Sequence, residues 1–177
     1  MYNTNNSYFS NNLLQWYDSN SRDLPWRKTN DLYKIWISEV MLQQTRVNTV
    51  VPYYLRWVEK YKSIKSVAKA DDLKLLKLWE GLGYYSRCRN FHKACKIIVN
   101  DYGGEIPSDY QKFRLLPGVG DYTASAVFSI GLKQTYAAID GNVRRVMARV
   151  LRIKNITNRN KKRINNTLIK WMDRERP

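Results

Sequence analysis

The feature that most constrains this chain is a helical spacing of apolar residues that recurs almost from end to end. Between Arg46 and Lys60 the apolar side chains fall at intervals of three and four residues, which places them on one face of an α-helix. No segment shows the longer apolar–polar alternation of a β-strand. The sequence therefore predicts an all-α protein, with helices over residues 10–19, 31–43, 46–60, 71–80, 84–101, 121–132, 141–151 and 161–173.

Capping and breaking residues suggest where these helices begin and end. Side chains that can accept a hydrogen bond from the free backbone N–H groups of a helix N-terminus precede several of them. Segments rich in glycine and proline lie between them, at residues 24–25, 81–83, 103–107 and 117–120. The expected N-caps are Ser10, Asp31, Asp71, Asp121 and Asp140.

The charge of the chain is strongly positive. Its 177 residues contain 31 Lys and Arg against 15 Asp and Glu, a net charge of +16. Such an excess favours a polyanionic partner, because each neutralised phosphate releases counterions, although charged helix faces in contact with water would explain it equally well. The basic residues crowd the last third of the chain: Arg144, Arg145, Arg149, Arg152, Lys154, Arg159, Lys161, Lys162 and Arg163.

Several classes of protein are excluded by composition. No run of 18 apolar residues is present, so we expect no membrane-spanning helix. Two cysteines cannot form a disulfide framework, and a reduced intracellular setting fits them best. Cys88, His92 and Cys95 share one helix face and could suggest a metal site. No fourth ligand is evident, so we expect these three side chains in the core and no bound metal.

Two segments have backbone features suited to an anion. Leu116-Pro117-Gly118-Val119-Gly120 places two glycines directly before a helix, where free N–H groups and the helix dipole favour a phosphate. An ordinary tight turn between helices is the alternative. Asp140 precedes the helix that carries Arg144, and it is either a simple N-cap or a carboxylate held ionised to stabilise a sugar cation.

Glu39 is the more informative carboxylate. On a helical wheel of residues 31–43, Asp31, Lys34 and Ser38 form the expected solvent face. Glu39 instead falls among Leu32, Ile35 and Trp36. An apolar setting raises a carboxyl pKa and keeps a general acid protonated near neutral pH. The alternative is a buried ion pair with Arg22, Arg27 or Arg87.

Five linked motifs resemble the adenine DNA glycosylase family, in the order and at the intervals typical of that family. They are Leu24-Pro25-Trp26-Arg27, Trp36-Ile37-Ser38-Glu39-Val40-Met41-Leu42-Gln43-Gln44-Thr45, Trp79-Glu80-Gly81-Leu82-Gly83-Tyr84-Tyr85-Ser86-Arg87, Leu116-Pro117-Gly118-Val119-Gly120-Asp121-Tyr122-Thr123-Ala124, and Ile139-Asp140-Gly141-Asn142-Val143. The resemblance runs from about residue 10 to the end. It implies a helix-hairpin-helix fold and removal of adenine mispaired with 8-oxoguanine or guanine in duplex DNA.

The resemblance also implies roles for individual residues. Glu39 matches the acid that protonates adenine and then handles the water, and Asp140 matches the carboxylate that stabilises the oxocarbenium ion or bonds to it. The remaining matches are the sugar-side residues Tyr122 and Asn142, the adenine-pocket residues Trp26 and Arg27, the residues around the lesion pair Gln44, Thr45 and Tyr84, and the phosphate-binding hairpin Gly118, Val119 and Gly120.

One position distinguishes this chain from endonuclease III-like relatives, which carry a lysine after the hairpin that forms a Schiff base and permits strand cleavage. Tyr122 stands at that position, so the resemblance implies a monofunctional glycosylase. The two alternatives are a DNA-binding protein that no longer cuts, and a related glycosylase that removes mismatched thymine.

The family pattern continues beyond Pro177, where its members add helices, an iron–sulfur cluster held by four cysteines, and a domain that reads 8-oxoguanine. Cys88 and Cys95 do not occupy the cluster positions, so we expect no cofactor in this chain. We expect a first helix within residues 1–20 that packs on the C-terminal helices, a helical barrel domain at 21–135 with the hairpin unit at about 108–132, and a truncated second domain at 136–177. We further expect apolar residues on the first and last helices to stay uncovered, and a cytoplasmic, nucleoid-associated monomer that binds duplex DNA.

Overall fold

The computed structural model describes residues 4–177, with side chains from Tyr8 onward, and residues 1–3 of the expected N-terminal segment lie outside it. Within the described residues every regular element is a helix, which confirms the predicted all-α class. The elements are α1 (Thr4–Asn20), η1 (Pro25–Arg27), α2 (Leu32–Leu42), α3 (Val47–Lys60), α4 (Ile64–Ala68), α5 (Asp72–Trp79), α6 (Ser86–Asp101), α7 (Tyr110–Arg114), α8 (Asp121–Leu132), α9 (Gly141–Val150) and α10 (Asn158–Trp171).

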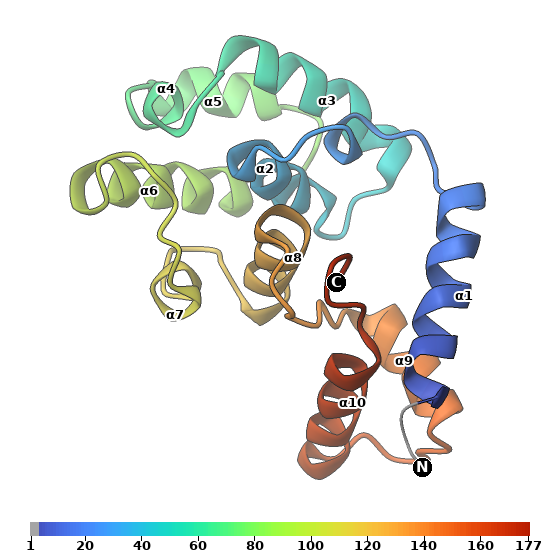
Figure 1. Cartoon of the computed structure of the whole chain (residues 1–177). Coiled ribbons are helices and arrows are strands. Elements are labelled where there is room, and N and C mark those ends of the chain that lie inside the picture. The colour runs from blue at the N-terminus through green and yellow to red at the C-terminus, as the bar shows by residue number, and fades with distance from the viewer. Residues whose placement is uncertain (1–3) are drawn as a thin grey trace.

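Helix α2 is the centre of the larger part of the fold. It packs against η1, α3, α6 and α8, and Figure 1 shows it enclosed by them. One continuous apolar core runs from Leu24 to Phe128 and is rich in aromatic rings. Trp36 contacts both Phe91 and Phe113, with ring centroids 4.5 and 5.3 Å apart. A helix covered on several sides is apolar around most of its circumference, which explains why every residue from Ile35 to Met41 is buried.

A second layer joins the two ends of the chain. Helix α1 packs against α10, and α10 packs against α9. In Figure 1 these three helices lie together to one side of α8, and the C-terminal segment runs back between α8 and α1. Phe9 and Trp171 mark the contact, with ring centroids 4.8 Å apart. Residues that are far apart in sequence therefore close this side of the molecule.

Three of the five expected N-caps are confirmed. Asp31, Asp71 and Asp140 each accept a backbone N–H bond at the start of α2, α5 and α9. Ser10 was a wrong prediction, because α1 begins at Thr4 and Ser10 lies inside it. Asp121 was also wrong: Gly120 is the N-cap of α8, and its carbonyl accepts the first helical bond, from Ala124 N–H at 2.9 Å.

The prediction that Ser38 faces solvent is also wrong. Its side chain is buried, and its hydroxyl donates to the Ile35 carbonyl at 2.7 Å. A wheel cannot reveal that α3 and α8 both cover this helix. The sequence patterns also missed the two five-residue helices α4 and α7, which are too short to show a helical period. Among residues 4–177, no helix has both the length and the apolar character needed to cross a bilayer.

Candidate active site

A cleft of about 640 Å³ opens where η1 and α2 face α1, α8 and the C-terminal segment. Glu39, Trp26 and Arg27 line it, as three of the residues expected at the base-binding site. Leu24, Ile35 and Leu42 give it apolar walls, and Tyr122 closes it from the start of α8. The cleft thus places the Glu39 carboxyl group and the Tyr122 phenol in a largely apolar pocket.

Glu39 is 8 % exposed and lies on α2. Burial raises the pKa of its carboxyl group above the ordinary value, and a hydrogen bond donated by Tyr122 opposes part of that rise. Among residues 4–177 no arginine forms an ion pair with Glu39, so the alternative of a buried ion pair is not supported. An apolar wall with a single hydroxyl partner favours the protonated acid, which is one of the two interpretations that the sequence left open.

Asp140 lies at the start of α9 and near Tyr122. One carboxylate oxygen accepts the Val143 N–H at 2.7 Å, and the other accepts the Asn142 side-chain amide at 3.1 Å. Burial raises the pKa of Tyr122, and the Glu39 and Asp140 carboxylates both add to the rise, so both carboxylates lie near this phenol. Asp140 itself is not among the residues that line the Glu39 cleft. The structure therefore brings Glu39 and Asp140 close to one phenol, Tyr122, and Asn142 holds Asp140.

Arg145 belongs to the same group of hydrogen-bonded polar side chains. Its guanidinium donates to the Asn142 side-chain oxygen at 3.0 Å. Because the Asn142 amide in turn donates to Asp140, the amide is oriented from both of its ends. Asn142 thereby fixes the Asp140 carboxylate rather than reaching into the cleft.

The hairpin between α7 and α8 has the expected backbone geometry at one glycine. Gly118 adopts φ +77°, and a Cβ atom there would lie 2.9 Å from the Asn90 side chain, so the position requires glycine. Gly120 instead has φ −97°, a backbone conformation that does not require glycine. Val119 is buried and anchors the turn. Gly120 then starts α8, whose first N–H groups point out of the hairpin.

Two further loops carry the residues expected around a lesion pair. Gln44 and Tyr84 are exposed and both adopt the left-handed backbone region, with φ +55° and +47°. Thr45 follows Gln44 and is half-buried. None of these three residues lines the Glu39 cleft. They form a separate group beside it, connected by the side chain of Arg87.

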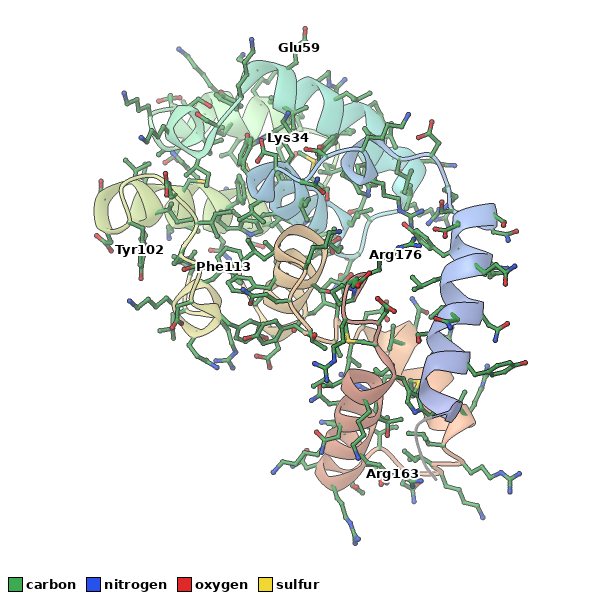
Figure 2. The ribbon with its side chains drawn as sticks, in the orientation of Figure 1. Lys34, Glu59, Tyr102, Phe113, Arg163 and Arg176 are labelled. Carbon is green, nitrogen blue, oxygen red and sulfur yellow. The ribbon has the colours of Figure 1, made fainter. Side chains whose placement is uncertain are left out.

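The basic residues of the last third are almost all exposed, with Arg144 partly buried. Figure 2 shows Arg163 at the end of α10 that is far from α8. Arg144, Lys161 and Lys162 instead line a second cleft of about 650 Å³ between α8 and α10, which shares Tyr122 with the first. Positive charge therefore borders the candidate active site and continues along α9 and α10.

The cysteines are core residues, as expected. Cys88 and Cys95 are buried in α6, and burial raises the pKa of the Cys88 thiol to about 12. His92 is buried beside them and its ring pairs with Asp72 at 2.5 Å. The described residues contain no group of three His, Cys, Asp or Glu side chains able to hold a metal ion. These residues do not fit a cluster that needs four thiolate ligands.

Some residues of the cleft were missed by the sequence analysis. Tyr17 on α1 and the C-terminal residues Arg176 and Pro177 line the cleft opposite Glu39. Arg27 lies over the Tyr17 ring, with 5.1 Å from its guanidinium carbon to the ring centroid. No local pattern could reveal this wall, because it forms only when the two ends of the chain meet. Figure 2 shows Arg176 between α8 and α1.

Fold and site together define a helix-hairpin-helix protein with a protonatable carboxylate in a cleft beside the hairpin. A family model described as "HhH-GPD superfamily base excision DNA repair protein" matches residues 37–174. The chain belongs to this superfamily of base excision DNA repair proteins, as the sequence resemblance predicted.

Curated relatives and a solved structure agree with this assignment. An adenine DNA glycosylase of Rattus norvegicus is 47% identical over 151 residues, which cover 80% of this chain and 29% of that protein. One from Buchnera aphidicola subsp. Acyrthosiphon pisum is 44% identical over 144 residues, covering 80% and 41%. The chain thus spans less than half the length of either relative. The structure of a thermostable thymine-DNA glycosylase superposes with a TM-score of 0.87 at 28% identity, covering 97% of this chain and 80% of that one.

Proposed function

We propose that this chain hydrolyses the N-glycosidic bond of adenine mispaired with 8-oxoguanine or guanine in duplex DNA. The observation that carries the proposal is Glu39, a buried carboxyl group with a raised pKa that is hydrogen-bonded to Tyr122 in an apolar cleft. The identity of 47% to an adenine DNA glycosylase supports adenine as the base.

In the proposed mechanism Glu39 acts first as a general acid. Its proton passes to a ring nitrogen of adenine, so that the bond between the base and C1′ breaks with its electron pair leaving on the base. The sugar becomes an oxocarbenium ion, and Glu39, now ionised, takes a proton from the water that attacks C1′. Enzymes that hydrolyse glycosides use a pair of carboxyl groups in a similar way.

Asp140 is the second carboxylate in this mechanism. It stabilises the positive charge on the sugar or bonds transiently to C1′. The Val143 N–H and the Asn142 amide hold it with one oxygen each, which fixes the direction of the carboxylate. Trp26 and Arg27 form part of the adenine pocket, while Gly118, Val119 and Gly120 grip a phosphate of the same strand.

Tyr122 leads us to propose a monofunctional enzyme. A Schiff base needs a primary amine at the sugar, and the group that lies near both Glu39 and Asp140 is a phenol. Borohydride treatment during the reaction should therefore trap little covalent adduct with DNA. Adduct in good yield would contradict this part of the proposal.

A thymine mismatch glycosylase is the second candidate, favoured by the similarity to the thymine-DNA glycosylase structure. A DNA-binding protein without base release is the third, since the chain is strongly basic. We also propose that the protein acts as a monomer on DNA in the cytoplasm, associated with the nucleoid.

A single-turnover assay distinguishes these candidates. Duplexes carrying adenine opposite 8-oxoguanine, or thymine opposite guanine, are incubated with excess protein, and base release is measured. Adenine release by the wild type should fall by at least about 100-fold in Asp140→Asn, because the lost charge stabilised the transition state. Asn is itself a good N-cap, so α9 should persist. Release of thymine in place of adenine selects the second candidate, and salt-sensitive binding without release selects the third.

A further inference from the structure

Arg87 is a buried cation with an unusual set of partners. It lies on α6 and is 7% exposed. None of the ion pairs among residues 4–177 includes it. A guanidinium removed from water costs free energy unless its donors are hydrogen-bonded; both terminal nitrogens of Arg87 are bonded, whereas its Nε has no hydrogen-bond partner among the described residues.

All six of its hydrogen bonds go to two short segments that flank the candidate active site. One guanidinium nitrogen, Nη1, donates to the carbonyls of Val40, Met41 and Gln43 at 3.1, 2.7 and 2.6 Å. The other, Nη2, donates to the Thr45 hydroxyl at 3.1 Å and to the carbonyls of Leu82 and Gly83 at 3.3 and 3.1 Å. We call residues 43–45, which directly follow α2, the first tip and residues 82–84 the second tip. Val40 and Met41 belong to α2 itself.

The first tip begins where α2 ends. The last carbonyls of a helix lack partners within the helix and carry the negative end of its dipole. Gln43 is the C-cap of α2, and Arg87 supplies both the donors and the positive charge that this end requires. The helix terminus replaces the carboxylate that would otherwise neutralise a buried arginine.

Each tip also contains one residue in a strained backbone region. Gln44 and Tyr84 adopt positive φ without being glycine, and the bonds of Arg87 reach the residue on each side of Gln44 and the residue before Tyr84. The Arg87 guanidinium also lies 5.4 Å from the Tyr84 ring centroid. Strained backbone persists only where its surroundings hold it in place, and here one side chain contacts both strained turns.

We propose that Arg87 is a positioning residue that sets Gln44 and Tyr84 at a fixed separation, so that both side chains enter the base stack around a flipped adenine together. This inference rests on the proposed function. Arginine suits the task because its planar guanidinium donates from two separate nitrogens. Nη1 bonds to Gln43 in the first tip, whereas Nη2 bonds to Gly83 in the second tip and also to the Thr45 hydroxyl in the first. A lysine ammonium is a single point and could hold only one tip.

The first test measures the tips themselves by amide hydrogen exchange in the free protein. Arg87→Lys should speed exchange in both tips by about tenfold or more, while Ile37 and other amides in the middle of α2 stay protected. Cys95→Ala is the matched control, a truncation in the core of the same helix that should leave both tips unchanged. Unchanged exchange in the tips of Arg87→Lys, or equal acceleration in the control, would overturn the inference.

The second test measures base unstacking with 2-aminopurine placed beside the mismatch. Arg87→Lys should lower the fluorescence rise on binding and reduce single-turnover adenine release by about tenfold or more, since small misplacements near a reacting group are costly. In a protein that already carries Gln44→Ala and Tyr84→Ala, Arg87→Lys should have little further effect. Full additivity would mean a general structural role and would refute positioning.

The two proposals fail in different ways. If the wild type neither unstacks nor releases adenine, the proposed function is wrong, while hydrogen exchange still decides whether Arg87 fixes the tips. If the wild type releases adenine and Arg87→Lys matches it in both tests, only the role of Arg87 is wrong.

Discussion

Residues 24–128 and the layer formed by α1, α9 and α10 bury very different amounts of apolar side chain, although both border the candidate active site. Every member of the main core cluster comes from the first region. In the described part of the second layer the fully buried hydrophobic residues are Met147 and Ile164, while Trp16, Val146 and Val150 are half exposed or more.

This difference shows that the two carboxylates are positioned by different means. Glu39 is held by a helix packed on several sides, so its direction and its raised pKa both depend on the core. Asp140 is held by hydrogen bonds from the start of its own helix, in a layer with little core of its own. Glu39 is therefore held in the cleft by packing, and Asp140, outside that cleft, by local capping.

The largest expected effect is on the packed side of the cleft. Glu39→Gln removes the transferable proton, and single-turnover adenine release should fall by about 10³-fold. The wild-type rate should itself decline as pH rises through the Glu39 pKa, which lies above its ordinary value, because the acid form is then lost. A rate that stays flat across this range would contradict the assignment of Glu39 as acid.

The same variant should change stability in the opposite direction. A carboxyl group whose pKa is raised by folding stabilises the protein at low pH, and this contribution is lost as pH rises through the folded-state pKa. Glu39→Gln should therefore unfold at a higher temperature than the wild type at pH 7.5, with the gain shrinking toward pH 4. Glu59→Gln on the exposed side of α3 is the control and should change neither property.

The second prediction compares the two cores directly by urea unfolding. Phe91→Ala should cost about 4 kcal/mol, because the ring is buried against Trp36 and Trp57 and its removal leaves a cavity. Trp171→Ala, in a partly exposed contact with Phe9, should cost about 1 kcal/mol. Equal losses of unfolding free energy would show that the layer of α1, α9 and α10 is packed as tightly as residues 24–128, and would contradict the comparison.

The smallest expected effect concerns the ion pair between Asp18 and Arg176, which joins α1 to the C-terminal segment through two hydrogen bonds of 2.5 and 3.0 Å. The Arg176 guanidinium lowers the pKa of Asp18, so the pair stabilises at neutral pH and this contribution is lost on acidification. Asp18→Asn should lower the melting temperature slightly at low salt and not at 1 M NaCl. Asp23→Asn is the control: it removes a local pair with Lys28 and should change the melting temperature less. A larger fall in melting temperature in this control would contradict the prediction.

The apolar surface expected on the first and last helices is present in part. Leu13 and Trp16 are 52% and 60% exposed, whereas Leu14, Leu168, Ile169 and Trp171 are partly covered by the contact between α1 and α10. A helical pattern identifies an apolar face but not its neighbour. The proposed division at residues 20 and 135 stays a prediction, to be tested by limited proteolysis.

Contacts between active-site residues could be predicted from the sequence only where the two residues are close together in the chain. Asn142 lies two residues from Asp140 and bonds to it, so a local motif contains both. The bond between Tyr122 and Glu39 and the reach of Arg87 to Gln43 join separate helices. The sequence analysis considered Arg87 only as a possible ion-pair partner of Glu39. A positive side chain first suggests a carboxylate partner, and the carbonyl groups at the C-terminus of a helix are a less obvious one.

The sequence by itself determined the eight longer helices, the caps at Asp31, Asp71 and Asp140, and the apolar surroundings of Glu39. These features depend on neighbours within one or two helical turns, and the order of residues fixes such neighbours directly. Only the tertiary structure decided that Ser38 is buried, that Tyr122 lies near both carboxylates, and that Arg87 joins both tips. Those contacts arise because α2, α6 and α8 pack side by side, and the spacing of residues along each helix does not specify which partner it meets.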